Sequence, residues 1–147
     1  IVVWTPHPSP EREHQLGVRF LELDELLATS DAVSIHVKLT ETTRGLIGMR
    51  ELARMRPGAL LVNTARGPVI DAEALKSALD SGHLGGAGLD VFAEEPMPAN
   101  DPLLSCDQVI LTPHCADGTP EGVDLLNGGA VENILAFLSG KPDNIVN

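Results

Sequence analysis

The chain has 147 residues, 43% hydrophobic and 21% charged, as expected for one soluble globular domain with an aliphatic core. Its net charge of −11 repels nucleic acid and anionic membrane, so we expect neither as a partner. Two cysteines are too few for a disulfide framework, and no metal-ligand spacing is present, so no metal site is predicted.

Short apolar runs alternate with amphipathic stretches along the chain. In chain order they predict a strand at 1–4, a helix capped by Ser9, a strand at 18–21, a helix at 23–28, a strand at 32–37, a loop or short helix at 42–47, a helix at 50–55, a strand at 59–63, a helix at 72–81 capped by Asp71, strands at 86–91 and 108–112, and a helix at 120–138.

This alternation predicts an α/β fold with a doubly wound, Rossmann-like parallel sheet covered on both faces. No linker divides the sequence, so residues 1–147 are expected to belong to one domain. No apolar run reaches the ~18 residues of a membrane span, and no signal peptide is recognisable. The sequence therefore predicts a cytoplasmic protein.

Ligands of such sheets bind beyond the carboxyl ends of the strands. Arg66, Asp90, Glu95 and His114 all follow predicted strands directly or nearly so. A guanidinium suits a substrate carboxylate, an imidazole exchanges protons near neutral pH, and a carboxylate beside it orients the ring. Each could instead be structural: a surface ion pair, a strand-end histidine, a solvated acidic loop, or a buried acid tied to backbone.

Together these groups suit hydride transfer to a 2-keto acid. Arg66 would hold the substrate carboxylate and polarise its carbonyl, while His114, oriented by Glu95, would supply or remove a proton. The hydride must come from a nicotinamide cofactor, because no side chain supplies one.

Four motifs resemble those of the D-isomer-specific 2-hydroxyacid dehydrogenases. They are N-T-A-R-G-P-V-I-D at 63–71, G-L-D-V-F-A-E-E-P at 88–96, T-P-H at 112–114 and T-R-G-L-I at 43–47. The resemblance implies Arg66, Glu95 and His114 as the catalytic set. It places Asp90 at the nicotinamide carboxamide and Thr64 and Ala65 beside the nicotinamide. Val37 and Thr43 would line the adenosine or nicotinamide-ribose region. The expected cofactor-binding residues are Thr5, Val37, Thr43, Thr64, Ala65, Arg66, Asp90, His114 and Ala116.

The sequence also departs from the family. The family's glycine-rich loop is absent from the sequence. Since 1–4 resembles the second strand of the fold, this loop and the first strand are expected just before Ile1. We therefore expect a partial dinucleotide-binding domain that is inactive alone, with 119–147 packing back toward a missing substrate domain. Cys115, beside His114, is predicted to be a small buried core thiol.

Cofactor choice stays open between NAD and NADP. Thr5 stands where NAD-dependent relatives have an acid, no arginine follows it immediately, and Arg12 lies further into the next predicted helix. NAD is the more usual cofactor in the family that the sequence resembles, and we therefore favour NAD. The resemblance further implies a homodimer and a small substrate such as glyoxylate, hydroxypyruvate or phosphohydroxypyruvate. The alternative function is a non-catalytic, dinucleotide-sensing scaffold like the family's corepressors.

Overall fold

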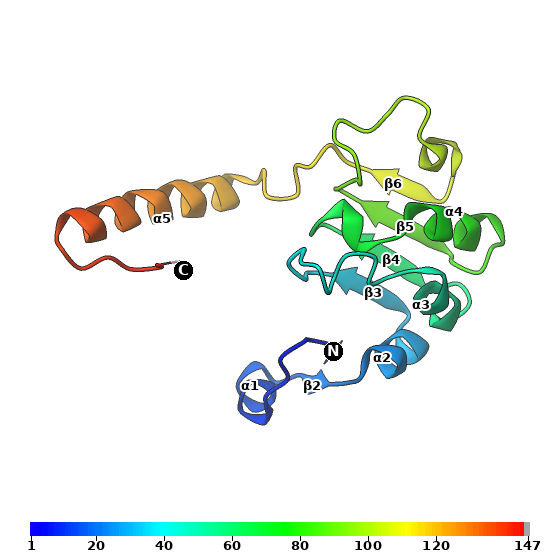
Figure 1. Cartoon of the computed structure of the whole chain (residues 1–147), viewed down its shortest axis with the longest axis horizontal. Coiled ribbons are helices and arrows are strands. Elements are labelled where there is room, and N and C mark those ends of the chain that lie inside the picture. Colours follow the sequence, from blue (N-terminus) through cyan, green and yellow to red (C-terminus); the bar gives the residue numbers. More distant parts are fainter. Residues whose placement is uncertain (146–147) are drawn as a thin grey trace. The chain divides into compact units, whose positions relative to one another are not determined.

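The computed structural model describes residues 1–145 and divides the chain into two compact units, Ile1–His114 and Cys115–Asn147. The strands of the first unit are β1 (Val2–Val3), β2 (Arg19–Phe20), β3 (Ala32–Ile35), β4 (Leu60–Asn63), β5 (Gly86–Leu89) and β6 (Val109–Leu111) (Figure 1). Its helices are α1 (Pro10–Leu16), α2 (Leu23–Thr29), α3 (Met49–Arg54) and α4 (Ala72–Asp80), with 3-10 turns η1 (Gly67–Val69) and η2 (Pro102–Ser105). The second unit contains α5 (Pro120–Leu138).

Strands β3 to β6 form a four-stranded parallel sheet in sequence order. Ile35 pairs with Asn63, Asn63 with Leu89, and Leu89 with Leu111, so the last residues of all four strands lie in one row. The residues that follow these strands therefore emerge side by side along one edge of the sheet.

Strands β1 and β2 form a separate parallel pair. In the doubly wound order the first strand lies between the second and the fourth. If β1 and β2 are the second and third strands, the break between the two sheets lies where the first strand belongs.

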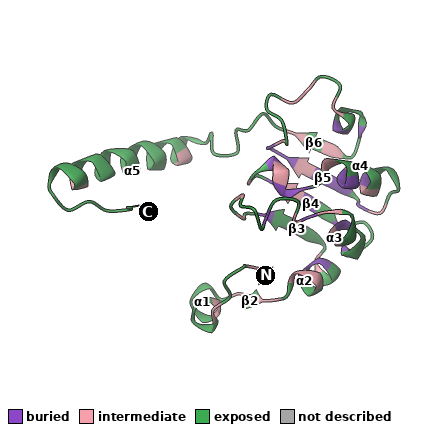
Figure 2. Ribbon diagram, in the orientation of Figure 1, coloured by how far each residue is buried: buried purple, intermediate pink, exposed green. Residues whose placement is uncertain are grey.

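Helices α2, α3 and α4 lie next to one another and pack on one face of the four-stranded sheet (Figure 1). The strand residues on that face are buried, among them Val33, Leu61 and Leu89. The alternate residues are less buried, and Leu60 and Ile110 are 48% and 73% exposed (Figure 2). The predicted α/β class and parallel sheet are confirmed. Within the first unit, the helices that pack on this sheet, α2, α3 and α4, lie on one face of it.

Most predicted elements are present, with boundaries shifted by one or two residues. Ser9 and Asp71 accept hydrogen bonds from the N–H groups of Arg12 (3.4 Å) and Ala74 (3.1 Å), as expected of helix caps. The two 3-10 turns were not predicted, because a single turn has no hydrophobic period.

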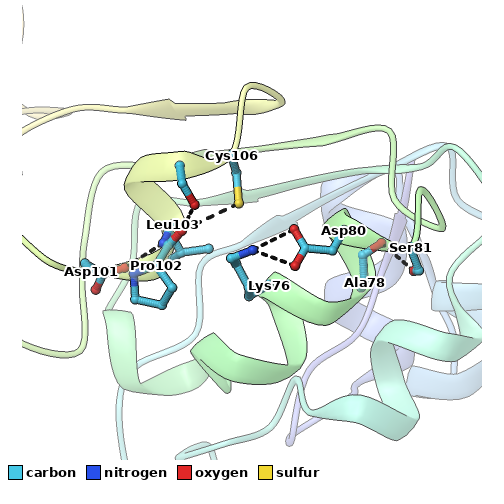
Figure 3. A network of polar contacts seen from close by, with 9 residues as sticks. Lys76, Ala78, Asp80, Ser81, Asp101, Pro102, Leu103 and Cys106 are labelled. Carbon is cyan, nitrogen blue, oxygen red and sulfur yellow. Dashed lines mark hydrogen bonds and ion pairs between the residues drawn. The ribbon is translucent and has the colours of Figure 1, made fainter.

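The turn η2 lies beside α4, where Cys106 is buried (Figure 3). The Cys106 thiol lies 3.8 Å from the carbonyl of Pro102, and Lys76 pairs with Asp80 one helical turn further along α4. Hydrogen bonding to Asp80 raises the pKa of Lys76. These contacts involve neither Arg66 nor His114, and we assign them a structural role.

The second unit is built around α5. Its first turn is capped by Thr119, whose hydroxyl accepts the N–H of Gly122 at 3.0 Å. Several large apolar side chains of α5 are exposed: Leu125, Leu126, Ile134, Leu135, Phe137 and Leu138. Among residues 1–145, no helix has both the length and the apolar character needed to cross a membrane.

Candidate active site

The carboxyl edge of the four-stranded sheet gathers the residues that the sequence singled out. His36, Thr64, Asp90 and Thr112 come directly after the four aligned strand ends. Arg66, Glu95 and His114 lie three to six residues beyond those ends. The register of the sheet is thus the reason that residues far apart in sequence meet at one site.

A compact loop after β4 carries Arg66. The fully buried Asn63 side chain accepts the N–H of Ala65 and donates to the carbonyl of Arg66, both at 3.0 Å. The Arg66 side chain is exposed, and its Nη1 donates to the Ala65 carbonyl at 2.6 Å. The guanidinium therefore lies at the surface of the edge, where its other N–H groups can reach a ligand.

His114 and Glu95 form the central polar pair. His114 Nδ1 lies 2.7 Å from Glu95 Oε2, and the N–H of Phe92 donates to Glu95 Oε1 at 2.9 Å. The backbone N–H of Phe92, then His114, lower the pKa of Glu95, and the charge of Arg66 adds a smaller effect in the same direction. The charge of Arg66 therefore acts on the same carboxylate as His114.

His114 has an unusual backbone conformation. Its φ is +53°, in the left-handed region that non-glycine residues rarely adopt, and its N–H donates to the Thr112 carbonyl at 3.0 Å. Such conformations gather at functional sites because the surrounding structure must hold them. The turn directs the His114 ring toward Glu95.

Asp90 is buried, with 3% of its surface exposed, at the end of β5. Its Oδ1 accepts a hydrogen bond from the Thr112 hydroxyl at 2.5 Å, and its N–H donates to the Asn63 carbonyl at 3.0 Å. The carboxylate is thus fixed between the ends of β5 and β6. Thr112 is the first polar residue after an apolar run, but no specific role in the site was predicted for it.

Val37 and Thr43 lie in the segment that follows β3. Val37 is half-buried against the core, whereas Thr43 is buried. The Thr43 hydroxyl donates to the Lys38 carbonyl at 2.6 Å and accepts the N–H of Thr40 at 2.8 Å. Thr43 therefore shapes this loop from within, and its predicted role in cofactor binding stays a prediction.

Thr5 lies beyond β1, beside a pocket of about 550 Å³. This pocket is lined by Trp4, Thr5, Pro6, Pro8, Phe20, Leu21, Glu22 and Glu25. Arg12 reaches back from α1, and its Nη1 lies 3.5 Å from the carbonyl of His7. The long side chain of Arg12 thus folds back from the helix toward this loop.

Cys115 and Ala116 belong to the second unit. Cys115 is exposed, so the predicted buried core thiol is wrong: the buried cysteine is Cys106. His114, with its positive φ, is the last residue of the first unit. The predicted role of Ala116 in cofactor binding stays a prediction.

The lowered pKa of Glu95 predicts a pH-dependent contribution to stability. A depressed carboxyl pKa stabilises the folded state above the unfolded-state pKa, and this stabilisation is lost as the pH falls through the folded-state value. We therefore expect the difference in unfolding free energy between wild type and Glu95→Gln to shrink as the pH falls from about 5 to about 3. Urea unfolding at several pH values measures this difference, and a constant difference would contradict the lowered pKa of Glu95.

A family model described as the NAD-binding domain of D-isomer-specific 2-hydroxyacid dehydrogenases matches residues 1–116. The chain is 48% identical over 136 residues to a glyoxylate reductase from Korarchaeum cryptofilum, covering 92% of this chain and 41% of that protein. It spans less than half the length of the curated relatives that it matches.

Two solved structures of 2-hydroxyacid dehydrogenases are similar to this chain. The NAD-complexed enzyme from Lactobacillus delbrueckii has a TM-score of 0.86 at 29% identity, covering 99% of this chain and 48% of that one. The enzyme from Xanthobacter autotrophicus, in complex with NADPH and MES, has a TM-score of 0.81 at 38% identity, covering 97% and 58%. Motifs, fold and family model agree: the chain belongs to the D-isomer-specific 2-hydroxyacid dehydrogenase family, as its NAD-binding domain.

Proposed function

We propose that residues 1–147 are the nucleotide-binding part of a longer oxidoreductase. The enzyme would transfer a hydride between NAD(P)H and a small 2-keto acid, with the D-2-hydroxy acid as the reduced form. The observation that carries the proposal is the 2.7 Å contact between His114 and Glu95, with the Arg66 charge acting on the same carboxylate. A cation, an acid/base pair and a fixed buried carboxylate at one sheet edge match the demands of this reaction.

In this proposal each residue has a distinct task. The guanidinium of Arg66 binds the substrate carboxylate and polarises the carbonyl oxygen. The contact with Glu95 uses His114 Nδ1, so Nε2 is the ring nitrogen that exchanges a proton with the substrate oxygen. Glu95 is held in place by the N–H of Phe92, and its contact with Nδ1 fixes the orientation of the His114 ring.

The edge also fits a nicotinamide. Asp90 presents a fixed acceptor for a carboxamide N–H, since a carboxylate oxygen can accept more than one hydrogen bond. Thr64 and Ala65 follow the neighbouring strand end and would lie along the ring, and Val37 would border the adenosine side. When bound, the nicotinamide supplies or accepts the hydride.

We propose NAD rather than NADP as the preferred cofactor. Thr5 marks the position of the adenosine ribose in this fold, and Glu22 and Glu25 line the adjoining pocket. Their carboxylates would repel a 2′-phosphate more than the 2′-hydroxyl of NAD. Arg12 is the opposing charge in this region, since it reaches the carbonyl of His7.

Residues 1–147 form, in this proposal, a partial dinucleotide-binding domain. The break between the two sheets supports a first strand supplied from elsewhere in the protein. The exposed apolar side chains of α5 support the proposal that 119–147 packs on a substrate domain. The homodimer and the cytoplasmic location stay predictions.

The test is oxidation of NADH and of NADPH by the full-length protein, with glyoxylate, hydroxypyruvate and pyruvate as substrates. We expect turnover with at least one acid and a higher kcat/KM with NADH. In the double variant Glu22→Gln and Glu25→Gln, the preference for NADH should weaken, whereas Arg12→Gln should strengthen it.

The outcomes separate the functions. No turnover with any pair, in folded protein that binds cofactor, would overturn the dehydrogenase and favour the scaffold. Turnover that prefers NADPH would keep the enzyme and overturn the assignment of Glu22 and Glu25.

A further inference from the structure

Asn63, the last residue of β4, is a polar side chain in the core. It is fully buried, with 0% of its surface exposed, and it lies on the same face of the sheet as the buried Leu61. A buried amide destabilises a fold unless its donors and acceptors are satisfied. Its position is therefore informative only through the groups that it binds.

The Asn63 amide closes the loop that carries Arg66. Its Oδ1 accepts the N–H of Ala65, and its Nδ2 donates to the carbonyl of Arg66, each at 3.0 Å. Among uncharged side chains, only an amide or a suitably placed hydroxyl or imidazole both donates and accepts. The two bonds fix the backbone on both sides of the Ala65–Arg66 peptide, and hence the direction in which the arginine side chain leaves the loop.

The Asn63 backbone links this loop to the next strand. Its carbonyl accepts the N–H of Asp90 at 3.0 Å, so the Arg66 loop and Asp90 are held by the same residue. The sheet itself maintains this third bond, whereas the two bonds to the loop depend on the amide. A change at the side chain should thus disturb Arg66 and spare Asp90.

We propose that Asn63 is a positioning residue whose buried amide aims Arg66 at the substrate carboxylate. This inference rests on the proposed dehydrogenase function, since Arg66 there binds the substrate. Asn63 itself touches neither substrate nor cofactor. It acts through the two hydrogen bonds to the loop backbone.

Asn63→Asp in the full-length protein is the sharpest change. The carboxylate keeps the size of the amide and still accepts the N–H of Ala65, but it cannot donate to the Arg66 carbonyl. A misplacement of about 1 Å can cost about 10²-fold, so we expect kcat/KM for the 2-keto acid to fall by about 10- to 100-fold. The Kd of NADH should change less than about threefold, because the ladder bond to Asp90 remains.

A double-mutant cycle with Arg66→Lys distinguishes positioning from general destabilisation. If Asn63 acts through Arg66, the two losses in kcat/KM are non-additive, and the double variant is little worse than Arg66→Lys alone. Additive losses would overturn the proposal. Gln108→Glu, also an amide-to-carboxylate change but at the exposed opposite end of the sheet, is the matched control and should keep wild-type activity.

Binding of oxamate to the NADH complex, measured by calorimetry, gives a readout without turnover. Oxamate carries the carboxylate and carbonyl of a 2-keto acid, so its affinity should fall in Asn63→Asp and stay unchanged in Gln108→Glu. Wild type that neither turns over nor binds oxamate overturns the proposed function. If wild type binds oxamate and the folded Asn63→Asp variant binds it equally tightly, this inference is overturned and the proposed function stands.

If Asn63→Asp does not fold, Asn63→Ser carries the test without a buried charge. A serine hydroxyl can accept the N–H of Ala65. Its side chain is too short to make the second hydrogen bond, to the Arg66 carbonyl, at the same time. The same loss of oxamate affinity and the same non-additivity with Arg66→Lys are expected. Wild-type values for both would overturn the proposal.

Discussion

Replacing His114 by alanine in the full-length protein is expected to lower kcat for the reduction of a 2-keto acid by about 10²–10⁴-fold, the usual contribution of a general acid or base. The physical reason is the loss of the ring whose Nδ1 contacts Glu95 at 2.7 Å and whose Nε2 would exchange the substrate proton. The Kd of NADH should change little, because the fixed carboxylate of Asp90 and the Arg66 loop are unaltered. Steady-state kinetics and a fluorescence titration with NADH measure the two effects.

The matched control is His14→Ala, which removes an exposed histidine from the last turn of α1. It should keep wild-type kcat. The pH profile adds a second check: the limb of kcat/KM that reports the catalytic acid should be missing in His114→Ala. A variant with wild-type kcat and an unchanged profile would remove His114 from the mechanism.

Much of this edge could be predicted from the sequence, for a simple physical reason. Buried strands are apolar, so each strand end is marked by the first polar residue after an apolar run, as with Asp90 and Thr112. A parallel sheet brings such ends to one edge. The sequence therefore predicted which side chains gather there, and the register of β3 to β6 places them in one row.

The contacts that hold the edge together could not be predicted in the same way. Asn63 ends an apolar run, but nothing in its spacing shows that its amide binds the backbone of Ala65 and Arg66. The folded-back side chain of Arg12 and the exposure of Cys115 depend on rotamers and on where the first unit ends. These features are tertiary, and hydrophobic periodicity carries no information about them.

Gly67 shows how closely two catalytic loops approach. A Cβ atom at this position would lie 2.0 Å from the carbonyl carbon of Phe92 and 2.5 Å from the nitrogen of Ala93. These are backbone atoms of the loop that leads to Glu95, so no side-chain rotation can relieve the clash. The loops of Arg66 and Glu95 can lie against each other only because residue 67 has no side chain.

Gly67→Ala is therefore expected to separate the two loops. We expect a loss of about 1–3 kcal/mol in unfolding free energy, as for other overpacked sites, and a fall in kcat/KM of about 10²-fold because Arg66 and Glu95 move apart. Thermal or urea unfolding and steady-state kinetics with a 2-keto acid measure the two losses on one preparation.

The control for this change is Gly48→Ala at the start of α3. There a Cβ atom meets its nearest neighbour, Oε2 of Glu51, at 3.5 Å, an ordinary contact, and the backbone φ is −106°. This variant should keep its activity and lose at most about 1 kcal/mol, the usual cost of alanine at a helix cap. If Gly67→Ala matched it in both stability and kcat/KM, the two loops would not depend on close packing. The arrangement of Arg66 against Glu95 would then need another cause.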